Sequence, residues 1–361
     1  MRELRTPDGL LVRAAEQADT PAMSRVIQAA FPEWPPVEID VSPLEFLEWK
    51  TNPPIVEPGQ HTVVEYDGEI VALKTHWVAR AQLYGSELTT DTGADFAVLP
   101  EFQGRGVSRL LNTYEEQADR PRGQLFFGSG TRAPAIEHMR QEAVVRPLRV
   151  WVRRLNWRAQ VSTRLRSGDV APLIREATGA VANTVRRLSA TAAAGRVARL
   201  RSFDQRTDAL WDAARSCFDL ATIRDATYLN WRYADRRAGR RLLLGQLDRD
   251  HAQAYAVFQP AGSTLQLSDL LVHPDHPRAG VEVLRAGVAV GRQRGAAAVN
   301  AWVPPGHRDE AVYEAAGFVP AESPISVQHK PPRGVSVPDV MAKVARSDLR
   351  EHLTMGDFDW T

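Results

Sequence analysis

Between residues 98 and 108 the chain reads Val98-Leu99-Pro100-Glu101-Phe102-Gln103-Gly104-Arg105-Gly106-Val107-Ser108. Residues 94–98 favour a strand, and the apolar spacing of residues 107–118 predicts a helix. The first turn of that helix leaves backbone N–H groups unpaired at the positive end of the helix dipole. Gly104 and Gly106 carry no side chains that would block a ligand. The segment therefore predicts a loop that binds a phosphate group.

The spacing within this loop resembles a known cofactor-binding pattern. Gln-x-x-Gly-x-Ser after a Val-x-Pro strand end is similar to the acyl-coenzyme A loop of the GNAT N-acetyltransferase superfamily, whose usual form is Arg/Gln-x-x-Gly-x-Gly/Ala. No Gly-Lys-Ser/Thr follows, unlike in a Walker loop, and the third glycine of a dinucleotide loop is absent. The resemblance implies acetyl-CoA or another acyl-CoA as co-substrate. It places the cofactor on Val98, Gln103, Gly104, Arg105, Gly106, Val107 and Ser108.

Length and composition limit the remaining possibilities. A chain of 361 residues is long enough for two domains. Cys217 is the single cysteine, so we expect neither an internal disulfide nor a cysteine metal cluster, and we expect Cys217 to fill a small apolar position. The sequence has no apolar run that could span a bilayer and no signal-peptide core, which favours a cytoplasmic protein. The excess of arginine over lysine is typical of a GC-rich bacterial genome.

Charge is unevenly distributed although the net charge is only +1. Residues 146–201 contain thirteen arginines and two acidic residues, Asp169 and Glu176. Such a segment can bind an anionic partner such as nucleic acid, but pairing with acidic surfaces of the same chain is the favoured interpretation. We expect no nucleic-acid and no membrane partner.

Two motifs recur in the same order and indicate an internal duplication. Residues 46–50, Phe-Leu-Glu-Trp-Lys, correspond to residues 228–232, Tyr-Leu-Asn-Trp-Arg. Further along, the pattern Asp-x-x-Val-x-Pro-acid begins at Asp95 and again at Asp269. One such match would mean little, whereas two in order favour a repeat.

Each half has the element order of a GNAT module. The first predicts strands 10–14, 61–65, 70–79, 88–98 and 124–127, helices 23–31 and 107–118, and a hairpin turn at Asp67-Gly68. The second predicts strands 197–203, 240–247, 254–259, 265–272 and 297–302 and a helix at 281–294. The expected fold is α+β, with two tandem GNAT-like modules that each have a mixed sheet flanked by helices. The expected boundaries are 1–160 for the first module, 161–195 for an Ala/Arg-rich helical connector, 196–335 for the second module and 336–361 for a tail that docks on the fold.

The two copies differ at the cofactor loop, which makes the second module degenerate. In the second copy Pro277 replaces the Gln103 position and removes a backbone N–H, and Arg278 replaces Gly104. The second copy keeps Tyr-x-x-x-Gly-Phe at 313–318, another GNAT signature, which the first copy lacks. We therefore assign cofactor binding to the first module.

Candidate acid and base residues come from the strand before the loop and from the resemblance. Asp91 and Asp95 are candidate bases, and strand alternation predicts both on one face. The recurrence of Asp95 as Asp269 favours a structural role equally well. The resemblance carries the family's tyrosine position onto His138, a candidate acid for the leaving thiolate. Tyr114 is expected to lie in the core.

These patterns predict an N-acyltransferase that moves an acetyl group from acetyl-CoA to a primary amine by direct attack in a ternary complex. The resemblance implies an amino sugar or natural product as the amine. Two alternatives stay open: a Fem-type transferase that uses aminoacyl-tRNA, and a non-catalytic acyl-CoA-binding or interaction protein. A homo-oligomer is possible on the sequence alone. We expect the tail to dock through Phe358 and Trp360.

Overall fold

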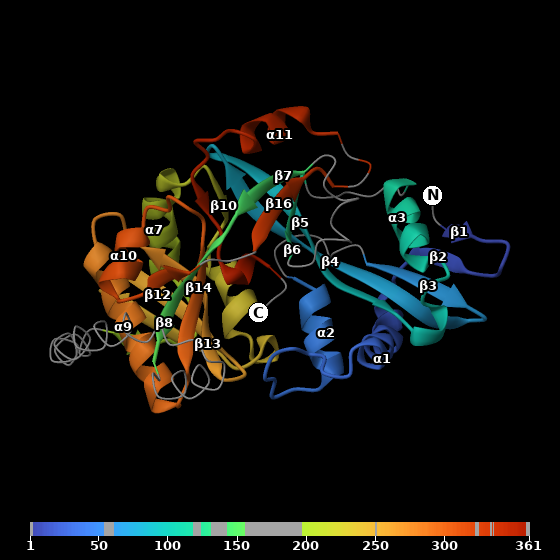
Figure 1. Ribbon diagram of the computed structural model, residues 1–361, viewed down its shortest axis with the longest axis horizontal. Coiled ribbons are helices and arrows are strands. Elements are labelled where there is room, and N and C mark those ends of the chain that lie inside the picture. The colour runs from blue at the N-terminus through green and yellow to red at the C-terminus, as the bar shows by residue number, and fades with distance from the viewer. Residues whose placement is uncertain are drawn as a thin grey trace, which may run out of the picture. The chain divides into compact units, whose positions relative to one another are not determined.

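The computed structural model describes residues 3–53, 61–117, 124–130, 143–155, 197–249, 251–321, 325–332, 334 and 336–358 (Figure 1). The expected connector at 161–195, His138 and Trp360 lie outside these residues. The chain divides into two compact units, the first formed by Met1–Leu148, Phe218–Arg240 and Pro324–Thr361, and the second by Arg149–Cys217 and Arg241–Ser323.

Strands of both units come from distant parts of the chain. Unit 1 contains β1 Glu3–Arg5, β2 Leu11–Ala14, α1 Thr20–Ala30, α2 Pro43–Thr51, β3 Thr62–Tyr66, β4 Glu69–Leu83, β5 Ser86–Val98, α3 Val107–Gln117, β6 Leu125–Gly130, β7 Val144–Pro147, β10 Leu220–Thr222, α8 Ala226–Leu229, β16 Ser326–Lys330, α11 Pro338–Val344 and β17 Glu351–His352. Unit 2 contains β8 Arg149–Arg154, β9 Ala198–Arg199, α7 Gln205–Ala214, β11 Leu242–Leu247, β12 Ala252–Ala261, β13 Thr264–Val272, α9 Pro277–Gln293, β14 Ala298–Val303, α10 Glu310–Ala315 and β15 Val319–Ala321.

The strands that belong to each unit show that the contiguous domain boundaries expected from the sequence are wrong. The expected first module, 1–160, includes β8, but β8 pairs with β14 and β15 in unit 2. The expected second module, 196–335, includes β16, but β16 lies between β6 and β7 in unit 1 (Figure 1). The two halves thus exchange a strand. Strand partners are chosen by long-range packing, which local periodicity does not encode.

Both sheets are mixed. Among the described residues, the main path of the first sheet runs β1-β2-β3-β4-β5-β6-β16-β7, and that of the second runs β15-β8-β14-β13-β12-β11-β9. The β5–β6 and β13–β14 pairs are parallel, while their other neighbours along these paths are antiparallel. The predicted hairpin at Asp67 and Gly68 is confirmed, and both residues have the positive φ values that such a turn requires.

A β-bulge occurs at the same place in both sheets and supports the predicted duplication. In the first, Lys74 pairs with Phe96 but His76 pairs with Gly93, so β5 has one extra residue. In the second, Val257 pairs with Asp269 but Phe258 pairs with Leu267. The hairpins differ in length, because the last pair before the tip is Leu83–Ser86 in one and Ala261–Thr264 in the other. Between the bulge and the tip, both strands of the first hairpin are longer than those of the second by the same number of residues. This difference explains why the two sequence motifs are separated by different numbers of residues in the two copies.

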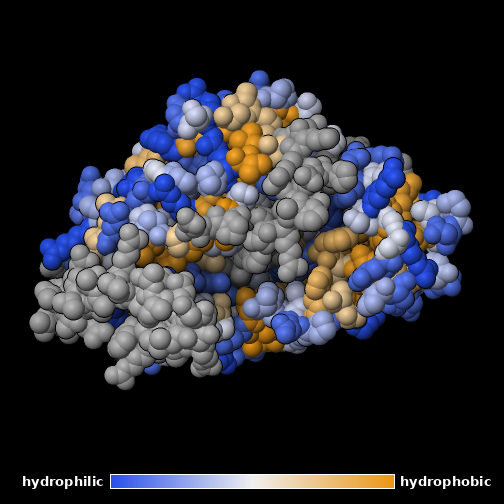
Figure 2. Space-filling model, viewed as in Figure 1, coloured by the Kyte–Doolittle hydropathy of each residue, from blue (hydrophilic) through white to orange (hydrophobic). Residues whose placement is uncertain are grey.

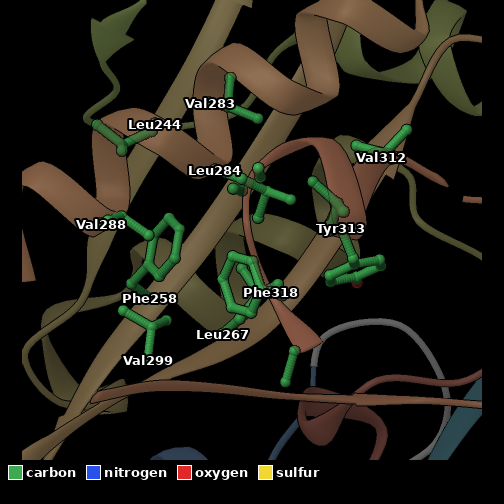
Figure 3. Close-up of a cluster of buried hydrophobic side chains, with 14 of the residues drawn as sticks. Leu244, Phe258, Leu267, Val283, Leu284, Val288, Val299, Val312, Tyr313 and Phe318 are labelled. Carbon is green, nitrogen blue, oxygen red and sulfur yellow. The ribbon is translucent and has the colours of Figure 1, made fainter. Parts of the chain in front are cut away.

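The hydrophobic cores follow the predicted helical faces. In unit 1, α3 buries Val107, Leu111 and Tyr114 against strand residues that include Val12 and Val64, so the core position expected for Tyr114 is confirmed. In unit 2, α9 covers the strands with Val283, Leu284 and Val288, and Phe258 fills the space beside them (Figure 3). A Cβ at Gly287 would lie 2.1 Å from Phe258 Cζ, so this helix position admits glycine alone.

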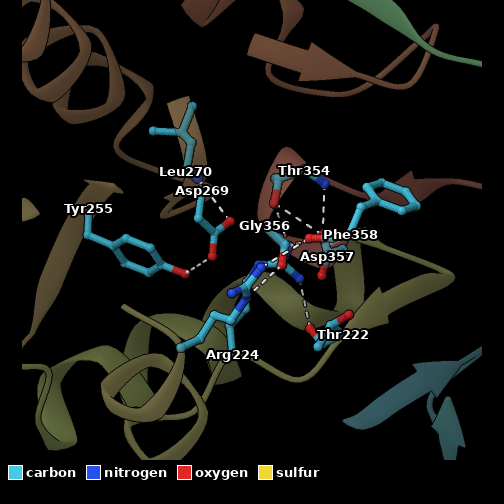
Figure 4. Close-up of polar contacts among 10 residues, drawn as sticks. Thr222, Arg224, Tyr255, Asp269, Leu270, Thr354, Gly356, Asp357 and Phe358 are labelled. Atoms are coloured by element: carbon cyan, nitrogen blue, oxygen red, sulfur yellow. Dashed lines mark hydrogen bonds and ion pairs between the residues drawn. The ribbon is translucent and has the colours of Figure 1, made fainter. Parts of the chain in front are cut away.

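Residues 351–358 form part of unit 1, as expected for the tail. Arg224 is 0% exposed and donates to Asp357 Oδ2 at 2.7 Å and to the carbonyl of Thr222 at 2.9 Å (Figure 4). Arg232, also 0% exposed, donates to the carbonyls of Gly356 and Phe358, both at 3.0 Å. Phe358 itself is buried. Buried charge with matched partners therefore holds this segment in place.

The view in Figure 2 shows a mostly hydrophilic face with separate hydrophobic patches. Cys217 is half-buried, and Arg308 donates to its Sγ at 3.0 Å, so the expected small apolar role is wrong. In the part of the chain that the structure describes, we find no helix with the length and apolar character needed to cross a membrane.

Candidate active site

The predicted cofactor loop joins β5 to α3 and has an open surface. Gly104 and Gly106 both have φ of 76°, a conformation that glycine adopts without strain, and a Cβ at either would have no neighbour within 4 Å. Gln103, Arg105 and Ser108 are exposed. The first intrahelical bond of α3 runs from the N–H of Leu110 to the carbonyl of Gly106, so the N–H groups of residues 107–109 precede the helical ladder. The loop presents donors to solvent at a helix N-terminus.

Contacts within the loop stabilise this shape. Gln103 donates from Nε2 to the carbonyl of Val98 at 3.1 Å, and its backbone N–H donates to Pro100 at 3.2 Å. The guanidinium of Arg105 lies 5.0 Å from the centre of the Phe102 ring. Gln103 therefore links the loop back to the end of β5, a role that the sequence did not indicate.

The strands beside the loop diverge. Within the described residues, the register between β5 and β6 ends at Thr92 and Phe127, whereas β5 continues to Val98. Among the described residues, no strand pairs with β5 on this side beyond Thr92, so its backbone groups there are positioned to pair with a bound ligand. This edge and the loop that follows it form one continuous candidate site.

The corresponding loop in unit 2 is closed by packing. Helix α9 begins at Pro277, and a Cβ at Gly280 would lie 2.7 Å from Val272 Cγ2 and 2.9 Å from Val312 Cγ1. Gly280 therefore contacts the core rather than open space. This geometry agrees with the prediction that the second loop has lost the ligand-binding form.

Asp91 and Asp95 lie on opposite faces of the sheet, so the prediction that they share a face is wrong. The bulge between Gly93 and Phe96 inserts one residue and reverses the alternation of the side chains that follow. Asp91 contacts His76 of β4 on the face covered by α3, and Asp95 lies on the opposite face, near α1 and α2. A β-bulge does not visibly change the hydrophobic periodicity of a sequence. The sequence pattern therefore gave the wrong face of the sheet for Asp95.

Three donor groups hold the Asp95 carboxylate. Lys50 Nζ lies 2.8 Å from Oδ2, Thr75 Oγ1 donates to Oδ2 at 3.2 Å, and Trp34 Nε1 donates to Oδ1 at 3.1 Å. The Asp95 backbone N–H donates to Thr75 Oγ1 at 2.7 Å. Because each carboxylate oxygen already accepts a hydrogen bond, the arrangement favours the structural alternative for Asp95 over a general base. The repeat-related Asp269 is buried and accepts from Tyr255 and Leu270 (Figure 4).

Asp91 belongs to a buried network that the sequence did not reveal. His76 Nδ1 lies 2.8 Å from Asp91 Oδ1, and Nε2 lies 2.9 Å from Glu115 Oε1. Lys74 Nζ lies 2.5 Å from Glu115 Oε2. A sequence signal existed, since Glu115 follows Leu111 by one helical turn and therefore falls on the apolar face of α3.

The network shifts the pKa values of its members. Burial by itself lowers the pKa of His76, but the charges and hydrogen bonds of Asp91 and Glu115 outweigh it and raise the pKa to about 8. Burial raises the pKa of Glu115, but His76 and Lys74 together lower it to about 2. His76 is therefore an imidazolium and Glu115 a carboxylate at neutral pH.

Comparison with known proteins places the fold. No protein-family model and no curated protein matches the sequence. The Saccharomyces cerevisiae N-myristoyltransferase with bound myristoyl-CoA and inhibitors is similar at a TM-score of 0.57 and 11% identity, covering 91% of this chain and 81% of that one. A probable N-acyltransferase of unknown function from Enterococcus faecalis V583 is similar at 0.55 and 10% identity, covering 89% and 72%.

A GCN5-related N-acetyltransferase from Anabaena variabilis is similar at a TM-score of 0.53 and 10% identity, covering 89% of this chain and 72% of that one. Identities of this size establish a shared fold. The similarity covers 89–91% of this chain and therefore spans both units. The chain therefore has the GNAT fold, in two α+β units that each contain a mixed sheet flanked by helices.

Proposed function

We propose that the chain is an acyl-CoA-dependent N-acyltransferase whose cofactor binds to the loop of unit 1. The observation that carries this is the open loop at Gly104 and Gly106, which lies at the N-terminus of α3 and beside the diverging edge of β5. Backbone N–H groups there suit a pyrophosphate, and the β5 edge suits the amides of a pantetheine arm. The packed loop at Gly280 supports assigning the cofactor to unit 1 alone.

The reaction proposed is direct transfer. The amine nitrogen attacks the thioester carbonyl, the C–N bond forms, the C–S bond breaks, and the proton released by the amine leaves with the thiol. Holding the two reactants together supplies much of the acceleration. The acceptor proposed is the primary amine of a small molecule such as an amino sugar, and the acyl group proposed is acetyl. Neither Asp91 nor Asp95 is proposed as the base, because ion pairs hold both.

The test is calorimetric titration of the full chain with CoA thioesters of increasing acyl length, followed by assay of free thiol release with a panel of amines. Acetyl-CoA should bind, raise the Tm, and release CoA with at least one amine. The myristoyl-CoA bound by the yeast structure makes a long-chain thioester the necessary comparison. If the protein prefers the longer thioester, the proposed acyl group is wrong, but the proposed type of reaction is unchanged.

Two results would overturn the proposal. If no acyl-CoA binds but tRNA raises the Tm in a salt-dependent way, the aminoacyl-tRNA-dependent alternative replaces it. If acyl-CoA binds but none of the amines releases CoA, the chain is an acyl-CoA-binding protein without transferase activity.

A further inference from the structure

Helix α3 carries a buried charge at the end opposite the loop. Four of its side chains are buried, Val107, Leu111, Tyr114 and Glu115, and Glu115 is the charged one. Its carboxylate lies 2.9 Å from His76 Nε2 and 2.5 Å from Lys74 Nζ, and both of these residues belong to β4. Apolar packing allows a helix to slide or turn by small amounts, whereas directional charge-assisted hydrogen bonds fix it. Glu115 therefore determines where α3 sits on the sheet.

The imidazole of His76 joins three elements through its two nitrogens. Nδ1 contacts Asp91 of β5, and Nε2 contacts Glu115 of α3. Carboxylates only accept hydrogen bonds, so both ring nitrogens must donate, and only the imidazolium can do this. A neutral ring would turn a lone pair toward one of the two carboxylates. The network of Lys74, His76, Asp91 and Glu115 is balanced, with two cations and two anions, only while His76 is protonated.

We propose that His76 is a positioning residue for the cofactor loop, holding α3 in its ligand-binding position while the imidazole is protonated. This rests on the proposed function, because it assigns the loop at the other end of α3 to acyl-CoA. An α-helix of eleven residues transmits a shift of its last turn to its first as a rigid body. The loop N–H groups of residues 104–108 then move relative to the β5 edge.

The direction of the pH effect follows from the groups that face His76. These are Asp91 from β5, Glu115 from α3, Lys74 through Glu115, and His61, whose Nδ1 accepts from the His76 backbone N–H at 3.2 Å. The two carboxylates raise the pKa of His76 to about 8 after burial has lowered it. The network is intact below that pH and loses a donor above it. Acyl-CoA binding should therefore weaken as the pH rises from 7 to 9.

The experiment measures the loop with and without ligand. Backbone amide NMR of the full chain follows Gly104 and Gly106 from pH 6 to 9.5, and calorimetry follows acetyl-CoA affinity over the same range. The second ionisation of the ligand's phosphate monoester lies near pH 6 and is nearly complete by pH 7, so a change between pH 7 and 9 does not come from the ligand. We expect the loop amides to shift with a midpoint near 8, and the Kd to rise about five- to tenfold.

Three variants separate positioning from general destabilisation. Asp91→Asn and Glu115→Gln each remove one anion that favours the imidazolium, so both should move the midpoint to lower pH. His76→Gln should abolish the transition between pH 7 and 9. His329→Gln is the matched control, because His329 of β16 is buried with Glu351, Nε2 to Oε1 at 2.6 Å, and does not belong to the network of Lys74, His76, Asp91 and Glu115. This control should lower the Tm and keep the wild-type midpoint.

The outcomes distinguish this inference from the proposed function. If the loop amides titrate with His76 but no acyl-CoA binds, the proposed function fails and the positioning role stands. If acetyl-CoA binds but neither the amides nor the Kd respond between pH 7 and 9, or Asp91→Asn leaves the midpoint unchanged, the positioning role is overturned and the function stands.

Discussion

Trp49 and Trp231 each donate the indole N–H to the other's backbone carbonyl. Trp49 Nε1 reaches the carbonyl of Trp231 at 2.8 Å, and Trp231 Nε1 reaches that of Trp49 at 3.3 Å, with ring centroids 5.5 Å apart. The two residues hold equivalent places in the repeated motif, and both lie in unit 1. The two copies of the repeated motif therefore contact each other within unit 1. The duplication thus contributes to the stability of that unit.

We predict that Trp49→Phe and Trp231→Phe are coupled. Each change removes one indole donor and leaves a buried carbonyl unsatisfied, at a cost of about 1–2 kcal/mol. Because the second change acts on a pair already disturbed, the double variant should lose less stability than the two single losses combined. Urea unfolding of the four proteins measures this. Pairing Trp49→Phe with Trp151→Phe, which packs on Tyr313 in unit 2, should give additive losses. Additivity in both cycles would refute the coupling.

Two substitutions of Gln103 test whether the loop binds acyl-CoA. Its φ of −67° is the value that proline adopts, but proline removes the N–H bond to Pro100 and the side-chain bond to Val98, and it disfavours the helical conformation of Phe102. We expect Gln103→Pro to abolish acyl-CoA binding and Gln103→Ala to weaken it several-fold, each with an unchanged fold by circular dichroism. Equal binding by Gln103→Pro and wild type would exclude the loop as the cofactor site.

We expect a change of charge to affect acyl-CoA binding at only one of the two repeat-related loops. Arg105 is exposed in the first loop, and Arg278, with 88% of its side chain exposed, occupies the second. Arg105→Glu places a negative charge beside the proposed phosphate site and should raise the Kd for acyl-CoA about tenfold or more. Arg278→Glu is the matched control and should bind like wild type. Calorimetry at fixed ionic strength compares the two, and a reversed result would move the cofactor to unit 2.

Asp95→Asn should lower stability before it affects catalysis. The change leaves the buried Lys50 ammonium without the charge of Asp95, which costs about 3–5 kcal/mol in comparable buried pairs. Asp269→Asn, at the repeat-related position, keeps one oxygen that can accept from the Leu270 N–H, and its NH2 can donate to the Tyr255 hydroxyl, so the change should cost about 1–2 kcal/mol. Denaturant unfolding gives both values. A variant of normal stability with a collapsed kcat would instead identify Asp95 as the base.

The stability of the chain should fall at alkaline pH because of His76. Its pKa is about 8 in the folded state against 6.5 for an ordinary histidine, so folding favours the proton. The stabilisation is complete below pH 6.5 and is lost as the pH rises through 8, a change of about 2 kcal/mol. Unfolding free energies measured from pH 6 to 9 should show this decline in the wild type and not in His76→Gln. A flat wild-type profile would mean that the imidazole is neutral.

Local features of the fold were predictable from the sequence, and features set by distant contacts were not. The turn at Asp67 and Gly68 and the helix after Gly106 depend on neighbouring residues, and both appear as expected. The exchange of β8 and β16 depends on which edges meet in three dimensions. The bulge beside Asp95 depends on pairing with β4, and the contact of His76 with Glu115 joins residues 39 positions apart. For the site, the loop followed from local pattern, whereas the charge network required the structure.

The exchange of β8 and β16 has a consequence for biosynthesis. β16 lies between β6 and β7, so the first sheet has a gap until residues 326–330 have left the ribosome. Arg224 and Arg232 likewise meet their carbonyl and carboxylate partners only after residues 356–358 have been made. The first sheet and its buried arginine contacts are therefore completed only after residues 326–358 have been made. Until residues 326–330 emerge, the nascent chain carries an unpaired edge at β6, and we expect this edge to need protection from aggregation.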